Sequence, residues 1–140
     1  MAVNAYIRFN GNCREAVEFY AQVFGLEKPK IMTFGESPSD PEYPMPEEAK
    51  ELVMHTFLII SGSRVMFSDN VPGMPFVAGN NISLAIVGND VDEIKSYYHK
   101  LEVGGTVVME IQETFWSKCY GMLTDKFGIE WQFSHESEEM

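Results

Sequence analysis

Residues 4–12 read NAYIRFNGN and residues 81–89 read NISLAIVGN, a near repeat at an offset of 77. In each stretch the apolar residues alternate with others, as they do in a strand with one buried face. A helix start follows each copy: an Asn12 cap with Glu15 in the first, and Asp90 with Glu93 in the second. Apolar spacing then predicts helices near 13–24 and 91–101. The chain therefore contains one strand–helix unit twice.

The ends of the two halves also match. GSRVMFSD (62–69) aligns with GIEWQFSH (128–135) at an offset of 66, and both have the alternation of a strand. The segments just before them, 55–61 and 121–127, are more weakly similar and are also predicted strands. Each half therefore reads strand–helix–strand–strand–strand, or βαβββ.

These repeats predict an α+β fold in which 1–140 form a single domain. Its half-modules are 1–69 and 80–136, and 70–79, with two prolines and two glycines, is the linker. The smaller offset at the ends means that the first half is longer. A segment rich in proline and acidic residues, 35–51, is the predicted insertion loop.

Composition narrows the possible partners and the cellular location. The net charge is −11 and only ten residues are Lys or Arg, which disfavours a nucleic-acid partner. Two cysteines are too few for a disulfide framework or a zinc cluster. The first residues lack the pattern of a signal peptide, and no apolar run approaches the roughly 20 residues of a membrane span. We expect a cytoplasmic protein that does not act at a membrane.

Several motifs, and above all one long block, identify a family. They are FNGN (9–12), FY (19–20), FGE (34–36), His55, MFSD (66–69) and QETFWSKCYGMLTDKFGIEW (112–131). With them the chain resembles the PhnB-like branch of the vicinal oxygen chelate superfamily, the glyoxalase, bleomycin-resistance and dioxygenase proteins. This branch is often labelled 3-demethylubiquinone-9 3-methyltransferase-like. The resemblance covers essentially the whole chain.

The resemblance implies two modules whose sheets curl around a cleft, usually in a homodimer. It also implies a divalent metal on the cleft floor, with ligands from the first and last strands of each half. Those positions fall here on Asn4, Met66, Asn81 and Gln132. Amide oxygens are weak neutral donors, and a thioether suits soft copper rather than hard cations. We therefore expect no catalytic metal and no cofactor.

Strand alternation selects the side chains that line the expected cleft, because successive residues point to opposite faces. In the family an aromatic pair, here Phe115-Trp116, lies near the cleft, although core packing is the alternative for Phe115 and for Trp131. The predicted ligand-binding residues are Tyr6, Arg8, His55, Phe57, Met66, Trp116, Cys119 and Gln132.

Several of these residues have more than one interpretation. His55 is either a general base or polar anchor in the cleft, or a partner of Asp69 across the sheet. Arg8 either fixes a carboxylate or phenolate, or pairs with Glu130. Cys119 follows Lys118, which would favour a thiolate, but buried structural cysteines are common.

The remaining titratable candidates have simpler interpretations. Cys13 directly follows a helix cap, and we interpret it as structural. His99 on the second helix and His135 near the end of the chain are expected to be solvated.

Three functions compete. The first is a metal-independent small-molecule-binding protein, with an aromatic cleft and an unidentified ligand. The second is a metal-dependent lyase, isomerase or dioxygenase, which the ligand positions disfavour. The third is the methyltransferase of the customary label. It is disfavoured because the chain lacks the Gly-rich turn of a doubly wound nucleotide-binding fold. We favour the first.

Overall fold

The structure is a computed structural model that describes residues 1–37 and 45–136. The chain divides into two compact units, Met1–Phe76 (unit 1) and Val77–Met140 (unit 2). Their boundary falls inside the predicted linker. Part of the predicted insertion loop, 38–44, lies outside the described residues.

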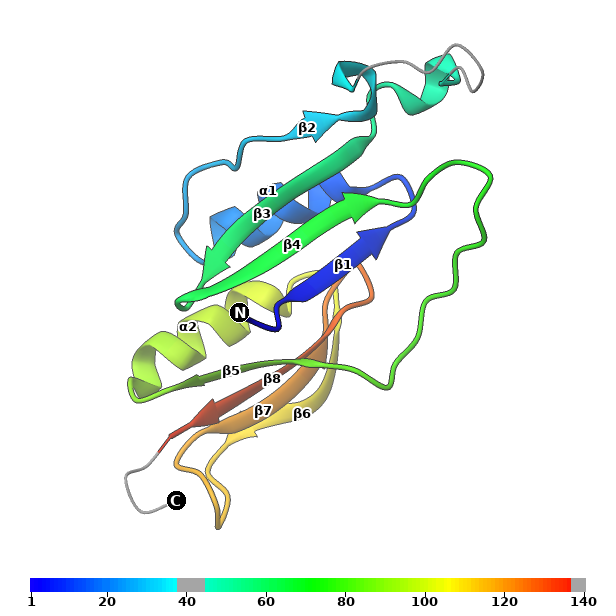
Figure 1. The fold of residues 1–140 in the computed structure, drawn as a ribbon. Helices are drawn as coiled ribbons and strands as arrows, with labels where there is room; N and C mark the ends of the chain where they lie inside the picture. The colour runs from blue at the N-terminus through cyan, green and yellow to red at the C-terminus, as the bar shows by residue number, and fades with distance from the viewer. Residues whose placement is uncertain (38–44, 137–140) are drawn as a thin grey trace. The chain divides into compact units, whose positions relative to one another are not determined.

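Unit 1 has the predicted βαβββ order. Its elements are β1 (Ala5–Phe9), α1 (Cys13–Val23), β2 (Met32–Thr33), β3 (Val53–Ile60) and β4 (Ser63–Asp69), with short 3-10 helices at Phe34–Glu36 and Glu47–Ala49. The sheet order is β1-β4-β3-β2, with β1 parallel to β4 and the other pairs antiparallel. In Figure 1, α1 lies behind this sheet and covers one of its faces.

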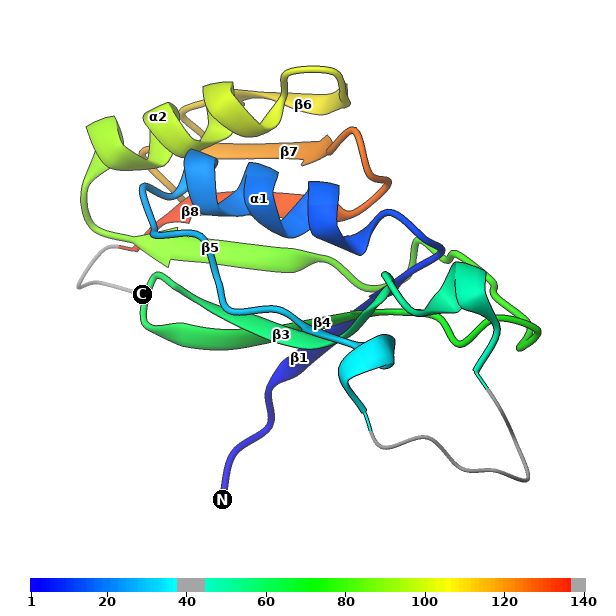
Figure 2. The same cartoon turned by 90° about the horizontal axis from the view of Figure 1, so that it is seen from above.

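Unit 2 repeats the same order. Its elements are β5 (Leu84–Gly88), α2 (Val91–Leu101), β6 (Thr106–Gln112), β7 (Tyr120–Thr124) and β8 (Glu130–His135). The sheet order is β5-β8-β7-β6, again with one parallel pair, and α2 runs along one face of this sheet (Figure 2). The α+β class and the two βαβββ modules are confirmed.

An aromatic pair joins helix to sheet in both cores. The rings of Tyr20 on α1 and Phe67 on β4 lie 5.8 Å apart, and those of Tyr98 on α2 and Phe133 on β8 lie 5.4 Å apart. All four side chains are fully buried. Aromatic pairs at this separation add to the free energy gained by burying the rings. The repeat seen in the sequence is therefore also a repeat of the core.

Strand pairing shows that the first strands of the two halves correspond at an offset two residues larger than the sequence repeat indicates. Ala5 pairs with Val65 and Leu84 pairs with Trp131. Val65 and Trp131 are 66 positions apart, so Ala5 corresponds to Leu84, 79 positions on rather than 77. Asn81 therefore precedes β5, and the counterpart of Asn4 is Ser83. The expectation that Asn4 and Asn81 are equivalent is wrong, although both lie on the same parity.

The helices begin and end for different reasons. Asn12 occupies the predicted N-cap position of α1, but its side chain makes no capping hydrogen bond. The predicted Asp90 cap of α2 is confirmed: its carboxylate accepts from the amide of Glu93 at 3.2 Å. Gly25, with φ +66°, ends α1 in the left-handed conformation that glycine tolerates best. No helix of the described chain has the length and apolar character needed to cross a membrane.

Candidate functional site

The face of the unit 1 sheet opposite α1 carries exposed aromatic side chains. We call it the open face of unit 1. Tyr6, Met66 and Phe57 form one row across β1, β4 and β3, because the register pairs Met66 with both of the others. Tyr6 is 45% exposed and Phe57 is 41% exposed. The alternation that predicted these residues on one face is confirmed, and the row presents two rings to solvent.

Two arginines approach this row. The guanidinium carbon of Arg8 lies 5.7 Å from the centre of the Tyr6 ring. That of Arg64, on β4, lies 4.1 Å from the centre of the Phe57 ring. A guanidinium within about 6 Å of a ring is attracted to its electron-rich face. Arg64 was not among the predicted site residues, although strand parity places it on the same side as Met66.

His55 also belongs to the open face of unit 1. Its ring lies 6.2 Å from that of Tyr6, in a tilted arrangement. Asp69 points to the other face, where its carboxylate accepts from the amides of Gly11, Cys13 and Val53. The alternative in which His55 bonds to Asp69 is therefore wrong. His55 therefore shares the open face of unit 1 with Tyr6.

Gln132 lies at the centre of a hydrogen-bonded chain on the corresponding face of unit 2. Its side-chain amide donates to the hydroxyl of Ser83 at 2.8 Å, and its oxygen accepts from the hydroxyl of Tyr120 at 2.8 Å. The same row of the sheet contains Ala85 and Met122. Sequence reasoning selected Gln132 but missed Tyr120, which has the same parity as Met122.

The predicted aromatic pair, Phe115 and Trp116, contacts this hydrogen-bonded group through Tyr120. The rings of Trp116 and Tyr120 meet edge to face at 5.3 Å, and those of Phe115 and Trp116 at 4.7 Å. Phe115 is 97% exposed, so its interpretation as a core residue is wrong. Trp131 is fully buried, as that interpretation required, and its indole N–H donates to Asp125 at 2.8 Å.

The two cysteines are placed for packing. Cys119 is 1% exposed and has the parity of Gly121, which faces Tyr98 on α2. Burial raises the pKa of the Cys119 thiol, and Lys95 only partly opposes it. Burial also raises the pKa of Cys13 to about 12, with Asp69 adding to the shift and Arg14 opposing it. Both thiols are protonated at neutral pH, so the thiolate considered for Cys119 does not fit its surroundings.

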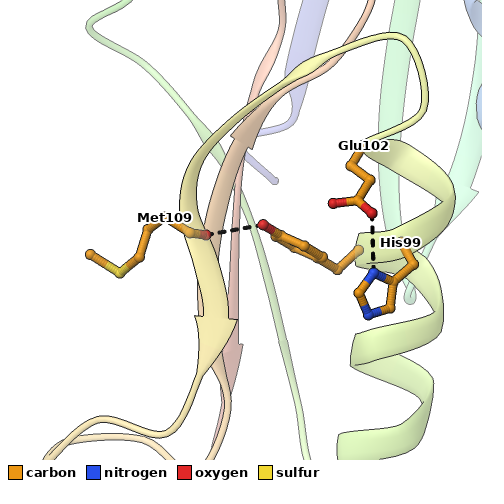
Figure 3. Close-up of polar contacts among 4 residues, drawn as sticks. His99, Glu102 and Met109 are labelled. Atoms are coloured by element: carbon orange, nitrogen blue, oxygen red, sulfur yellow. Dashed lines mark hydrogen bonds and ion pairs between the residues drawn. The ribbon is translucent and has the colours of Figure 1, made fainter.

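The two remaining histidines differ from each other. His99 is exposed on α2, as expected, and Nδ1 of its ring lies 3.2 Å from the Glu102 carboxylate (Figure 3). Figure 3 also shows the hydrogen bond from the hydroxyl of Tyr98, one residue before His99, to the carbonyl of Met109. His135 is half-buried; Nδ1 of its ring is buried and has no partner among the described residues, so this nitrogen is not solvated as expected.

The donor groups do not suit a hard divalent cation. Among residues 1–37 and 45–136, no group of three or more His, Cys, Asp or Glu side chains could hold a metal. Met66 lies beside two rings, and the amide of Gln132 already bonds to two hydroxyls. Neutral oxygens and a thioether are a poor donor set for hard divalent cations.

Known proteins resemble this chain along nearly its whole length. Residues 2–133 match the Glyoxalase/Bleomycin resistance protein/Dioxygenase superfamily. Protein YjdN of Escherichia coli strain K12 is 31% identical over 144 residues, which cover 96% of this chain and 95% of that protein.

Two solved structures share the fold and part of the sequence. Protein PA1353 from Pseudomonas aeruginosa gives a TM-score of 0.84 at 33% identity, over 97% of this chain and 98% of that chain. The PhnB protein of Bacillus cereus, whose name suggests a 3-demethylubiquinone-9 3-methyltransferase, gives 0.73 at 26% identity, over 97% and 100%. With its two βαβββ modules and its similarity to the PhnB protein, this chain belongs to the Glyoxalase/Bleomycin resistance protein/Dioxygenase superfamily.

Proposed function

We propose that the protein binds a small aromatic molecule on the open face of unit 1 and does so without a metal ion. One observation carries the proposal: Tyr6 and Phe57 present exposed rings from two strands, on either side of Met66. Rings held by a paired sheet offer an apolar surface that loses little freedom on binding. A flat ligand can stack on this row while its polar groups contact Arg8 and His55.

The chemistry of the available donors supports metal independence. A divalent cation must give up part of its hydration shell, and strong oxygen or nitrogen ligands offset that cost. Unit 1 offers Met66 at its expected ligand position, and unit 2 offers Gln132. Gln132 is instead suited to hydrogen-bond a neutral polar group, since its oxygen and nitrogen each have a second bonding site.

A thermal-shift screen with planar aromatic compounds tests the proposal, since a ligand that binds the folded state raises the melting temperature. We expect at least one compound to stabilise the wild type, and the double variant Tyr6→Ala, Phe57→Ala to lose that response. Val103→Ala is the matched control, because Val103 is an exposed apolar residue outside the sheets. A response that survives in the double variant would overturn the proposed site.

Metal independence needs its own experiment. Elemental analysis of protein purified without chelator, followed by titration with Mn, Ni, Zn and Fe, should find no stoichiometric metal. Aromatic binding should be unchanged after treatment with EDTA. Tight stoichiometric metal that is lost in Gln132→Ala or Asn81→Ala would move the protein to the metal-dependent lyases, isomerases or dioxygenases.

The homodimer implied by the family is also part of the proposal. Each four-stranded sheet ends in two edge strands, β1 and β2 in unit 1 and β5 and β6 in unit 2, and a second copy can cover such an edge. Sedimentation at micromolar concentration should give a mass near twice 15.9 kDa. A single species at the monomer mass would remove this part.

A further inference from the structure

We infer that the ligand of the open face of unit 1 is a planar aromatic carboxylate. The inference rests on the proposed function, because it names the chemical class of the molecule that this face binds. Three features of the face carry it: its charge, the positions of its two guanidiniums, and the edge that a stacked guanidinium leaves free.

The charge of this face is opposite to that of the protein. The chain has a net charge of −11 and three arginines, Arg8, Arg14 and Arg64. Two of the three lie on the open face of unit 1. On the described strands, the positions that share its parity carry no carboxylate, and Asp69 bonds to amides on the opposite face. An anion therefore meets a positive surface here on an otherwise acidic molecule.

The two guanidiniums approach the aromatic row from its two sides. Arg8 follows Tyr6 by two residues along β1, and Arg64 precedes Met66 by two residues along β4. Because β1 and β4 are parallel, these steps run in opposite directions, each about 7 Å from the row. Both side chains nevertheless reach rings of that row. A ligand stacked on the row therefore lies within reach of both.

Within the described part of unit 1, neither guanidinium forms an ion pair with a carboxylate. Among the described residues, the ion pairs join Lys50 to Glu47 and His99 to Glu102, and neither Arg8 nor Arg64 takes part in one. A guanidinium that contacts a ring through its flat face keeps the N–H donors along its edge. Those donors match the two oxygens of a carboxylate. Arg64, only 4.1 Å from the Phe57 ring, is well placed to bind in this way.

The rest of the face suits the aromatic part of the same molecule. Met66 places a polarisable thioether between the two rings, where it can contact a third. His55, whose ring lies 6.2 Å from that of Tyr6, adds a polar group to the same face. A ligand with one flat ring system and one carboxylate satisfies all of these groups.

The test compares three ligands of one shape: 2-naphthoate, 2-naphthamide and 2-naphthylmethylamine, titrated by calorimetry into the full chain. We expect 2-naphthoate to bind at least about 10-fold more tightly than the amide, because charged hydrogen bonds are worth more than neutral ones. The amine should bind most weakly. Raising the salt concentration should weaken only the naphthoate.

Variants then locate the effect. Arg8→Gln and Arg64→Gln should each weaken naphthoate about 10-fold and leave the amide unchanged. Arg14→Gln is the control, since Arg14 lies on α1 and its guanidinium donates to the Glu51 carbonyl at 3.4 Å. If Arg64→Gln fails to fold, Arg64→Lys keeps the charge but not the paired donors and should still weaken naphthoate.

The outcomes separate this inference from the proposed function. Equal binding of naphthoate and amide, lost in the Tyr6→Ala, Phe57→Ala variant, keeps the aromatic site but overturns the preference for carboxylates. Naphthoate binding that is unaffected in both Arg8→Gln and Arg64→Gln overturns it as well. Failure of all three ligands, and of the wider aromatic screen, removes the aromatic site and this inference together.

Discussion

The N-termini of α1 and α2 occupy the same place in two copies of one module, yet they are capped differently. In unit 1 the carboxylate of Asp69, at the end of β4, accepts from the amides of Gly11 and Cys13 at 2.9 and 3.0 Å. In unit 2 the cap is Asp90, three residues before the amide that it binds. One helix depends on a distant strand, whereas the other carries its own cap.

The position equivalent to Asp69 in unit 2 is His135, 66 residues later. Nδ1 of His135 is buried and has no partner among the described residues. The buried aspartate of unit 2 is Asp125, in the turn between β7 and β8. It accepts from the amides of Phe127 and Ile129 and from the indole of Trp131. The two modules have the same strand order, but the buried carboxylate lies at the end of β4 in unit 1 and in the turn between β7 and β8 in unit 2.

In this fold, the strand order and the position of the buried carboxylate can therefore vary independently of each other. If that is right, removing each carboxylate should affect stability in proportion to the buried donors it leaves behind. The free energy of unfolding, measured by chemical denaturation, tests this, and the exposed Asp92→Ala is the common control.

Asp69→Ala should have the largest effect. It leaves three amides without their acceptor, and two of these hydrogen bonds, from Cys13 and Val53, are buried. Unpaired buried donors cost about 1–3 kcal/mol each, so we expect a loss of about 3 kcal/mol. A loss no greater than that of Asp92→Ala would mean that α1 does not depend on β4.

Asp125→Ala should cost less, about 2 kcal/mol, because two of its three donors are turn amides that water can reach. The third donor is the buried indole of Trp131. A change in tryptophan fluorescence should accompany the loss. Equal costs for Asp125→Ala and Asp69→Ala would show that the burial of the donors does not set the order.

The two cap residues nearest the helices form a matched pair. Asp90→Ala should cost about 1 kcal/mol, as removal of a working cap does. Asn12→Ala should change the stability by less than about 0.5 kcal/mol, because the Asn12 side chain makes no capping bond. The reverse order would contradict the assignment of Asp69 as the cap of α1.

Alkaline pH should reveal a further small effect, through Cys13. Its pKa is about 12 in the folded protein against 9.0 for an ordinary thiol. Above pH 9 the unfolded chain releases this proton while the folded chain retains it, so stability falls as the pH rises. Between pH 8 and pH 9.5 the wild type should lose somewhat less than about 1 kcal/mol more than Cys13→Ala does. Equal pH dependence of the two would contradict the raised pKa.

Much of the fold could be predicted because its determinants are local and repeated. Alternation in 4–12 and 81–89 marks strands, and capping and apolar spacing mark helices. The same parity rule selected the row of Tyr6, Met66 and Phe57, which needs no knowledge of neighbouring strands. These predictions depend only on residues a few positions apart.

The predictions that failed depend on pairings between distant residues. The residues around Asn12 have the pattern of a helix cap, but the amide of Cys13 donates instead to Asp69, which lies at the other end of the module. Phe115 is aromatic yet almost fully exposed, and nothing in its immediate sequence distinguishes it from Trp131. Cation–π contacts such as that of Arg64 require a strand register that the sequence did not specify.

The shift from 77 to 79 between the first strands also indicates which length changes such a module tolerates. Because side chains alternate along a strand, a slip of one residue would turn every inward side chain outward, whereas a slip of two preserves each face. Length changes at the start of this strand are therefore filtered by parity. Even steps leave the core and the open face intact, so equivalent residues of the two halves keep the same orientation although their numbering offset differs.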